Sequence, residues 1–260
     1  MKTKTSVNHP FLTLVVMGTA LLAPLAGLAS QTDDRIESSL KDTYVFKTFL
    51  KEDSIKVQST DGVVVLTGTV KDGSSRSLAE ETAGNLPGVI SIDNQLEVAA
   101  DSPPEYSDDW ITLKVKMVLM FHRNVSALGT QVTTENAIVI LRGEAPSAAH
   151  RELATEYARD VKGVKAVRNE MTIAVVPTVE DSPVAEKIDD ASITAQVKTS
   201  LKTHQSTSAA NTEVHTMDGV VTVGGVAENA AEKSLVSKLA NDINGVTKVI
   251  NDMTLKVAAK

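Results

Sequence analysis

The chain has 260 residues, a formal net charge of −7 and no cysteine. Without a thiol it has no disulfide, thiolate metal site, cysteine nucleophile or lipid-modified cysteine. Its acidic charge favours solubility and argues against general nucleic-acid binding, because phosphate contacts need clustered lysine and arginine.

Positions 1–29 have the layout of a secretory signal peptide. Lys2 and Lys4 precede an apolar stretch, 11–28, which is followed by small and polar residues. We expect cleavage near Ala29 or Ser30, and a mature protein in a bacterial periplasm that is not a lipoprotein. The alternative is a retained anchor helix, since the apolar stretch is nearly long enough to cross a bilayer.

The sequence from there to about position 99 alternates between helical and strand periodicity. Ile36 and Leu40 lie at helical spacing, and Asp33 is expected to be the N-cap of their helix. Alternating apolar residues over 55–70 predict a hairpin with its turn at 60–62. A second helix that Gly88 ends and a strand over 89–98 complete the order αββαβ.

This pattern returns twice, with Asp33 corresponding to Asp108 and then to Asp190. In the same register, the segment 61–68 recurs as 136–143 and as 218–225. The glycine that closes the second strand is followed at a constant distance by a later glycine in every copy. We expect both glycines of each copy to provide close backbone approach or a positive φ. They are Gly68, Gly88, Gly143, Gly163, Gly225 and Gly245.

Proline and acidic residues separate the copies, as is typical of linkers. After a signal peptide over 1–29, we predict three modules over 31–99, 106–175 and 187–258. The fold class is α+β, with the two helices of each module packed on one face of a three-stranded mixed sheet. A parallel crossover between strands would be right-handed.

The order of elements, the glycine that closes the second strand and the later Gly-Val…Asn sequence resemble the BON domain family. The resemblance covers nearly all of the chain after position 30, three times over, and extends to osmotically inducible periplasmic proteins with two such domains. It implies an envelope location, association with phospholipid membranes and protection against osmotic or envelope stress. It brings no catalytic residues.

A search for reactive groups favours a protein that is not an enzyme. The four histidines after the leader are His122, His150, His204 and His215. We expect none of them at a repeated position and each at the surface or half-buried, and no HExxH or GxSxG motif occurs. Asp33, Asp108 and Asp190 recur, and helix capping explains them better than acid catalysis. We therefore predict no catalytic residue, metal, cofactor or small-molecule substrate.

The first helix of the middle copy has two apolar faces. At about 100° per residue, Ile111, Val115 and Leu119 form the face that every copy buries. A second apolar stripe lies on the opposite side, with basic residues beside it. We expect this stripe to contact a membrane or a partner through Trp110, Leu113, Lys114, Lys116, Met117, Met120, Phe121 and Arg123.

Three kinds of contact would cover such a stripe. The first is the bilayer interface, where apolar groups enter the headgroup region and lysine or arginine meets anionic lipid. The second is packing against the first or third copy or another chain. The third is holdase-like binding of unfolded envelope proteins, or a scaffold role, since methionine adapts to varied partners. The family resemblance favours docking on anionic phospholipid surfaces.

Overall fold

The structure is a computed structural model, and it describes residues 26–123, 125, 129–174, 187–207 and 212–256. Most of the expected signal peptide lies outside these residues, and the first described helix begins at Ala26. Within the described ranges, no helix has the length and apolar character needed to cross a bilayer.

The first module packs two long helices and one helix of five residues with a three-stranded sheet. Strand β2 lies in the middle, antiparallel to β1 and parallel to β3. Leu40 and Leu78 from the helices meet Leu66 of β2 in a core that excludes water. The predicted fold class is confirmed. The elements are α1 (Ala26–Asp42), α2 (Tyr44–Thr48), β1 (Ser54–Thr60), β2 (Val63–Val70), α3 (Gly73–Gly84) and β3 (Ser91–Val98).

The second and third modules repeat this arrangement, with the last strand split in two. Both halves pair parallel with the central strand of their sheet. The second module contains α4 (Asp108–Phe121), β4 (Thr130–Glu135), β5 (Ile138–Ala145), α5 (Ala148–Arg159), β6 (Ala166–Asn169) and β7 (Thr172–Ile173). The third contains α6 (Asp190–Thr203), β8 (Thr212–Met217), β9 (Val220–Ala227), α7 (Ala230–Asn241), β10 (Lys248–Asn251) and β11 (Thr254–Leu255).

The asparagine of the Gly-Val…Asn sequence ties the last strand to the second helix. Asn169 donates from Nδ2 to the Arg151 carbonyl and to Thr155 Oγ1, at 2.8 and 2.7 Å. Its Oδ1 accepts the amide of Met171, two residues on, at 2.9 Å. Asn251 makes the corresponding bonds in the third module. This asparagine therefore has a structural role in the module.

The second helix of the first module ends earlier than expected. It stops at Gly84, and Asn85 is its C-cap, so Gly88 lies beyond it in the turn. The other two modules end this helix at the equivalent residues without a proline, so the end is a property of the module. The chain leaves each helix through a turn in which an amide bonds three residues back, as Leu86 does to Ala83 and Val161 to Ala158. Gly88 has φ +91°, and a Cβ there would lie 3.4–3.5 Å from Thr32 and Ile36 of α1. It lets this turn pass close to the first helix.

The glycine that closes the second strand stands where no side chain fits. Gly68 has φ +116°, and an added Cβ would lie 1.9 Å from the carbonyl oxygen of Ser54 on β1. Gly143 has the same φ, with a Cβ position 2.0 Å from the carbonyl oxygen of Gly129. Such contacts are sterically forbidden, so the edge strand can approach only a residue without a side chain.

The repeated aspartate does not cap the first helix, and that prediction was wrong. Asp33 accepts hydrogen bonds from the amides of Asp61 and Gly62, at 2.9 and 3.0 Å, and from Ser59 Oγ at 2.6 Å. These bonds, led by that of Ser59, lower its pKa. The turn residues have φ of 51° and 78°, a conformation in which their amides point away from the ladder. The carboxylate supplies the acceptor that the hairpin lacks.

The same clamp recurs in the other two modules, where separate residues cap the helices. Asp108 accepts from the amides at positions 136 and 137, and Asp190 from those at 218 and 219, at 2.7–2.9 Å. The N-caps are Ser107 and Asp189, the residues directly before these aspartates. The clamp joins positions 28 residues apart, so helix periodicity did not indicate it.

We expect Asp108→Ala to lower the free energy of unfolding by about 1.5 kcal/mol, because two turn amides lose a charged acceptor. Asp109→Ala is the matched control, since this exposed neighbour lies in the same helical turn. Urea unfolding followed by the fluorescence of Trp110, the only tryptophan, measures both. Equal effects of the two substitutions would contradict the clamp.

The second and third modules face each other across an approximate twofold axis. His122, the C-cap of α4, pairs with Ile243, and His204, the C-cap of α6, pairs with Val161. The register that aligns Asp108 with Asp190 also aligns His122 with His204 and Val161 with Ile243. Four backbone bonds obey the same symmetry: Arg123 to Asp242, Gln205 to Asp160, Asn244 to Phe121 and Lys162 to Thr203, at 2.9–3.2 Å.

The two histidines at this interface contradict the expectation for them. His122 and His204 occupy equivalent positions and are buried, 1% and 0% exposed. His122 stacks on Tyr157 with ring centroids 3.9 Å apart, and its nitrogens lack a hydrogen-bond partner of good geometry in the described chain. The Nδ1 atom of His204 is hydrogen-bonded to Asp160 at 2.7 Å. The repeat register of the second and third modules could have revealed the equivalence from the sequence alone.

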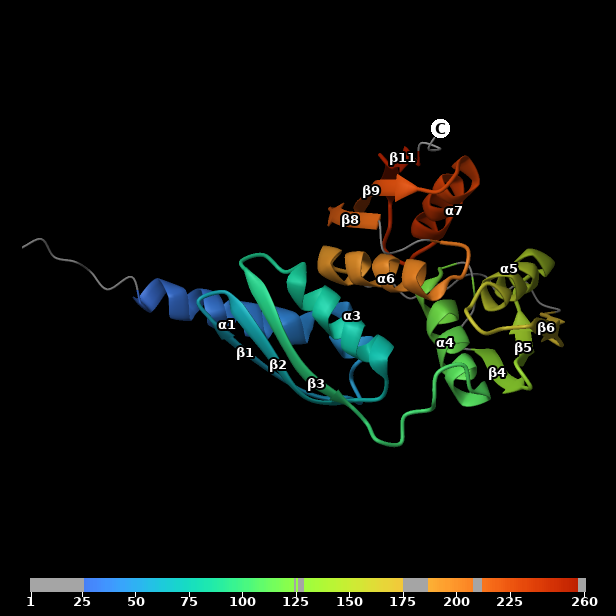
Figure 1. Cartoon of the computed structure of the whole chain (residues 1–260), viewed down its shortest axis with the longest axis horizontal. Helices are drawn as coiled ribbons and strands as arrows, with labels where there is room; N and C mark the ends of the chain where they lie inside the picture. The colour runs from blue at the N-terminus through green and yellow to red at the C-terminus, as the bar shows by residue number, and fades with distance from the viewer. Residues whose placement is uncertain (1–25, 124, 126–128, 175–186, 208–211, 257–260) are drawn as a thin grey trace, which may run out of the picture.

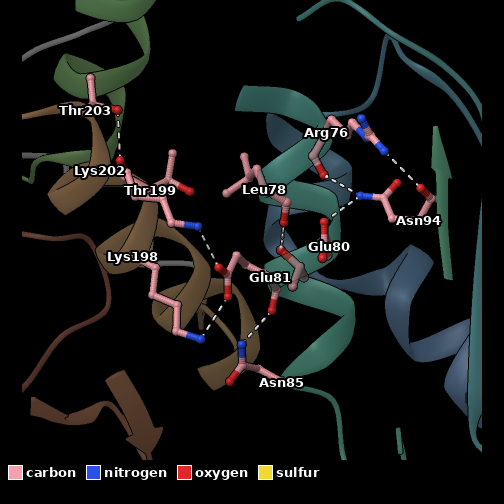
Figure 2. A network of polar contacts seen from close by, with 11 residues as sticks. Arg76, Leu78, Glu80, Glu81, Asn85, Asn94, Lys198, Thr199, Lys202 and Thr203 are labelled. Carbon is pink, nitrogen blue, oxygen red and sulfur yellow. Dashed lines mark hydrogen bonds and ion pairs between the residues drawn. The ribbon is translucent and has the colours of Figure 1, made fainter. Parts of the chain in front are cut away.

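The first module rests on α6, which lies beside α3 in Figure 1 with β8 and β9 on its other side. Small residues on α6, such as Ser192, Ala195 and Thr199, are at most 3% exposed, which lets the helices approach closely. Figure 2 shows Glu81 of α3 between Lys198 and Lys202 of α6, with N–O distances of 2.8 and 2.9 Å. Burial alone would raise the pKa of Glu81, but its two lysine partners lower it.

Candidate functional site

The second apolar stripe of α4 faces the first module over much of its length. Phe121 is fully buried, and its ring meets that of Phe49 edge to face with centroids 4.9 Å apart. Trp110 is half-buried beside Tyr106, with centroids 5.1 Å apart. Packing between modules, one of the three expected kinds of contact, therefore covers the Phe121 end of the stripe, whereas Trp110 is covered in part by Tyr106 of its own module.

Lys114 forms a buried ion pair and cannot reach a lipid headgroup. Its Nζ lies 2.9 Å from Oδ1 of Asp72, and the two side chains are 4% and 3% exposed. Asp72 is the N-cap of α3 and accepts the amides of Ser74 and Ser75. Ser74 Oγ also accepts from Lys114, whose ammonium lies 5.2 Å from the centre of the Trp110 ring. The pair joins the first and second modules.

Arg123 is also engaged within the protein. Its guanidinium donates to the carbonyl oxygens of Ile243 at 3.1 Å and Val246 at 2.5 Å, and to that of Asn241. These carbonyls belong to the third module, at the end of α7 and in the loop after it. This arginine holds the interface between modules.

The remaining stripe residues line a groove between the first module and α4. We call it the α2–α4 groove, and its volume is about 280 Å³. Its apolar wall combines residues far apart in the sequence. These are Phe49 after α2, Leu78 of α3, and Leu113, Met117 and Met120 of α4. Met120 is the most exposed residue of this wall, and 39% of its surface is open to solvent.

Positive charge predominates at the mouth of this groove. Lys51, Lys71 and Lys116 line it together with one unburied acid, Glu52. The hydrogen bond and charge of Lys71, 2.5 Å away, lower the pKa of Glu52, and Lys51 contributes to the same shift. Lys51 and Lys116 have no ion pair within the described ranges. Asp72 also lines the groove, but its ion pair with the buried Lys114 neutralises its negative charge.

The lining of the groove combines an apolar wall with charged groups. Most of its wall is apolar, a few charged groups converge at its mouth, and no histidine lines it. In the part of the chain that the structure describes, no three His, Asp or Glu side chains gather as a metal site would require. Sequence periodicity identified Leu113, Lys116, Met117 and Met120, but it missed Phe49, Lys51 and Lys71 because they belong to another module.

Comparison with known proteins agrees with the repeat and the fold. The model of the BON domain matches three stretches, 32–100, 107–175 and 189–257. The osmotically-inducible protein Y of Escherichia coli K12 is 26% identical over 202 residues, which are 78% of this chain and 98% of that protein.

Two further relatives cover less of the chain. The 21 kDa hemolysin of Actinobacillus pleuropneumoniae is 35% identical over 121 residues, 45% of this chain and 62% of its own length. The outer membrane lipoprotein DolP of Haemophilus influenzae is 27% identical over 165 residues, 59% of this chain and 83% of its own length.

Proposed function

The chain belongs to the BON domain family, and from this premise we propose that it is a non-enzymatic envelope protein that docks on anionic phospholipid surfaces. Its role would be protection against osmotic or envelope stress. The name of the relative that matches most of this chain supports that role, since it describes an osmotically inducible protein.

Another relative, DolP of Haemophilus influenzae, is named an outer membrane lipoprotein, which supports an envelope location for this chain. The 260 residues of this chain contain no cysteine that could carry a lipid anchor. With the signal peptide removed, membrane contact would use the protein surface and would be reversible.

The observation that carries the proposal is the mouth of the α2–α4 groove. Lys51, Lys116 and the exposed Met120 line the same groove, in a chain whose net charge is negative. Each basic residue near an anionic lipid surface contributes about 1 kcal/mol. The methionine side chain can enter the headgroup boundary.

Co-sedimentation with vesicles of phosphatidylglycerol and phosphatidylethanolamine tests this proposal. We expect Lys51→Glu/Lys116→Glu to weaken vesicle binding by at least about thirtyfold, because two attractive charges of about 1 kcal/mol each are lost and two repulsive charges are added. Lys165→Glu/Lys248→Glu has the same net charge and alters exposed lysines on the other two modules. It should retain most of the binding.

The holdase alternative predicts a different result. Met117 and Met120 would then receive apolar segments of unfolded proteins, since methionine adapts to varied shapes. Suppressed aggregation of a denatured client, without binding of the wild-type protein to anionic vesicles, would replace membrane docking with this function.

A further inference from the structure

The α2–α4 groove is concave, and a bilayer surface cannot fill it. Its apolar wall comes from two modules, with Phe49 and Leu78 on one side and Leu113, Met117 and Met120 on the other. Leu78 is fully buried, so the wall continues into the packed core of the first module. A volume of about 280 Å³ lies at the lower end of the range for small-molecule pockets.

The wall offers little to a peptide backbone. A bound peptide must satisfy its amides and carbonyls, and a hydrocarbon chain has no such requirement. The polar side chains at the groove are mostly charged groups at its mouth, and Lys71 and Asp72 are already paired. The two methionines can adjust to a flexible chain.

The charges at the mouth select the sign of the ligand. Lys51 and Lys116 are free of ion pairs in the described residues, and the exposed acid that lines the same groove, Glu52, is bound to Lys71. An anionic group at the mouth would gain two charge-assisted contacts, whereas a cationic group would meet like charge.

We propose that the α2–α4 groove takes the hydrocarbon chain of one anionic single-chain amphiphile, a fatty-acid carboxylate, with its head group held by Lys51 and Lys116. This inference rests on the proposed function, because docking on phospholipid would bring the groove to a source of such molecules. It differs from docking because the groove would bind a single ligand molecule dissolved in water, without a membrane surface.

Isothermal titration of the full chain with dodecanoate, below the concentration at which it forms micelles, tests the inference. We expect one bound molecule per chain. Octanoate should bind about two hundredfold more weakly, because four methylenes are no longer buried. Dodecyltrimethylammonium, with the same chain and opposite charge, should bind at least tenfold more weakly than dodecanoate.

Two variants locate the site. Met120→Trp fills the groove from its exposed side and should weaken dodecanoate binding at least tenfold, while Met217→Trp, at an exposed position of the third module, should leave it unchanged. Lys51→Glu/Lys116→Glu should reduce the preference for dodecanoate over the cationic amphiphile. Circular dichroism confirms that each variant is folded.

The outcomes separate this inference from the proposed function. A wild-type protein that binds anionic vesicles but not dodecanoate, or dodecanoate binding that Met120→Trp leaves intact, overturns the inference and retains docking. Dodecanoate binding that Met120→Trp removes, without vesicle binding, supports the groove and removes membrane docking. Failure of both assays removes both proposals.

Discussion

Asp72→Ala is expected to destabilise the protein by about 3–5 kcal/mol, because it leaves the ammonium group of Lys114 buried without its partner. The Asp72 and Lys114 side chains are 3% and 4% exposed, so water cannot replace the lost contact. The substitution also removes the N-cap of α3, which adds about 1 kcal/mol. Urea unfolding followed by Trp110 fluorescence measures the loss, since Lys114 lies against that ring.

A double substitution separates the charge from the cap. Asp72→Asn keeps an N-cap acceptor, and Lys114→Met keeps an unbranched apolar side chain. Together they remove both buried charges, and we expect the pair to be clearly less destabilising than Asp72→Ala alone. The neighbouring exposed Lys116→Met is the control and should cost less than about 0.5 kcal/mol. An Asp72→Ala protein as stable as this control would refute the role of the ion pair.

Acid is expected to weaken the interface between the second and third modules, through His122. Burial lowers the pKa of His122 from 6.5 to about 3, the nearby His204 adds to this shift, and the backbone of Asp242 opposes it. Since the folded pKa is the lower one, the unfolded chain binds the proton more tightly. Stability is therefore complete above the unfolded pKa and declines as the pH falls from 6.5 toward about 3.

The size of this effect follows from linkage. Between about pH 8 and pH 5, His122 should cost the protein about 2 kcal/mol of unfolding free energy. His122→Phe keeps a ring that can stack on Tyr157 and has no group to protonate. Urea unfolding at several pH values measures the effect. The unfolding free energy of the wild type, minus that of this variant, should fall by about 2 kcal/mol between about pH 8 and pH 5. His215→Gln, at an exposed position, should leave the pH dependence unchanged. Parallel curves for wild type and His122→Phe would exclude this histidine as the cause.

The module could be predicted because its signals are local and repeated. The two-residue turn at Asp61 and Gly62, the alternation of β2 and the glycine at 68 depend on neighbours in the chain or in the adjacent strand, and Gly88 packs against α1 of the same module. Each signal occurred three times at constant spacing, which distinguished it from chance. The role of the repeated aspartate was misread because Asp108 and Asp190 are the first residues of their helices, next to the position of an N-cap, while Asp33 lies inside α1.

The contacts between modules have weaker signals in the amino-acid sequence. Ser192, Ala195 and Thr199 resemble a solvated helix face in sequence, yet they are buried against the first module. Small side chains allow two helices to approach closely, and such a contact leaves no apolar stripe in the sequence. The stripe of α4 was visible as apolar, but its pattern could not show that Phe121 meets Phe49 and that Lys114 meets Asp72.

By itself, the amino-acid sequence determined three copies of one αββαβ module, their turns and an acidic chain without thiol chemistry. Only the tertiary structure decided that half of the α4 stripe is covered, that His122 faces His204, and that Lys51 joins Lys116 at one groove. The reason is physical. A module's backbone follows from interactions between residues near each other in the repeat. The assembly depends instead on shape and on charge pairs whose members belong to different modules. Lys114 and Asp72 form such a pair and lose water together, whereas Lys202 meets Glu81 at the surface.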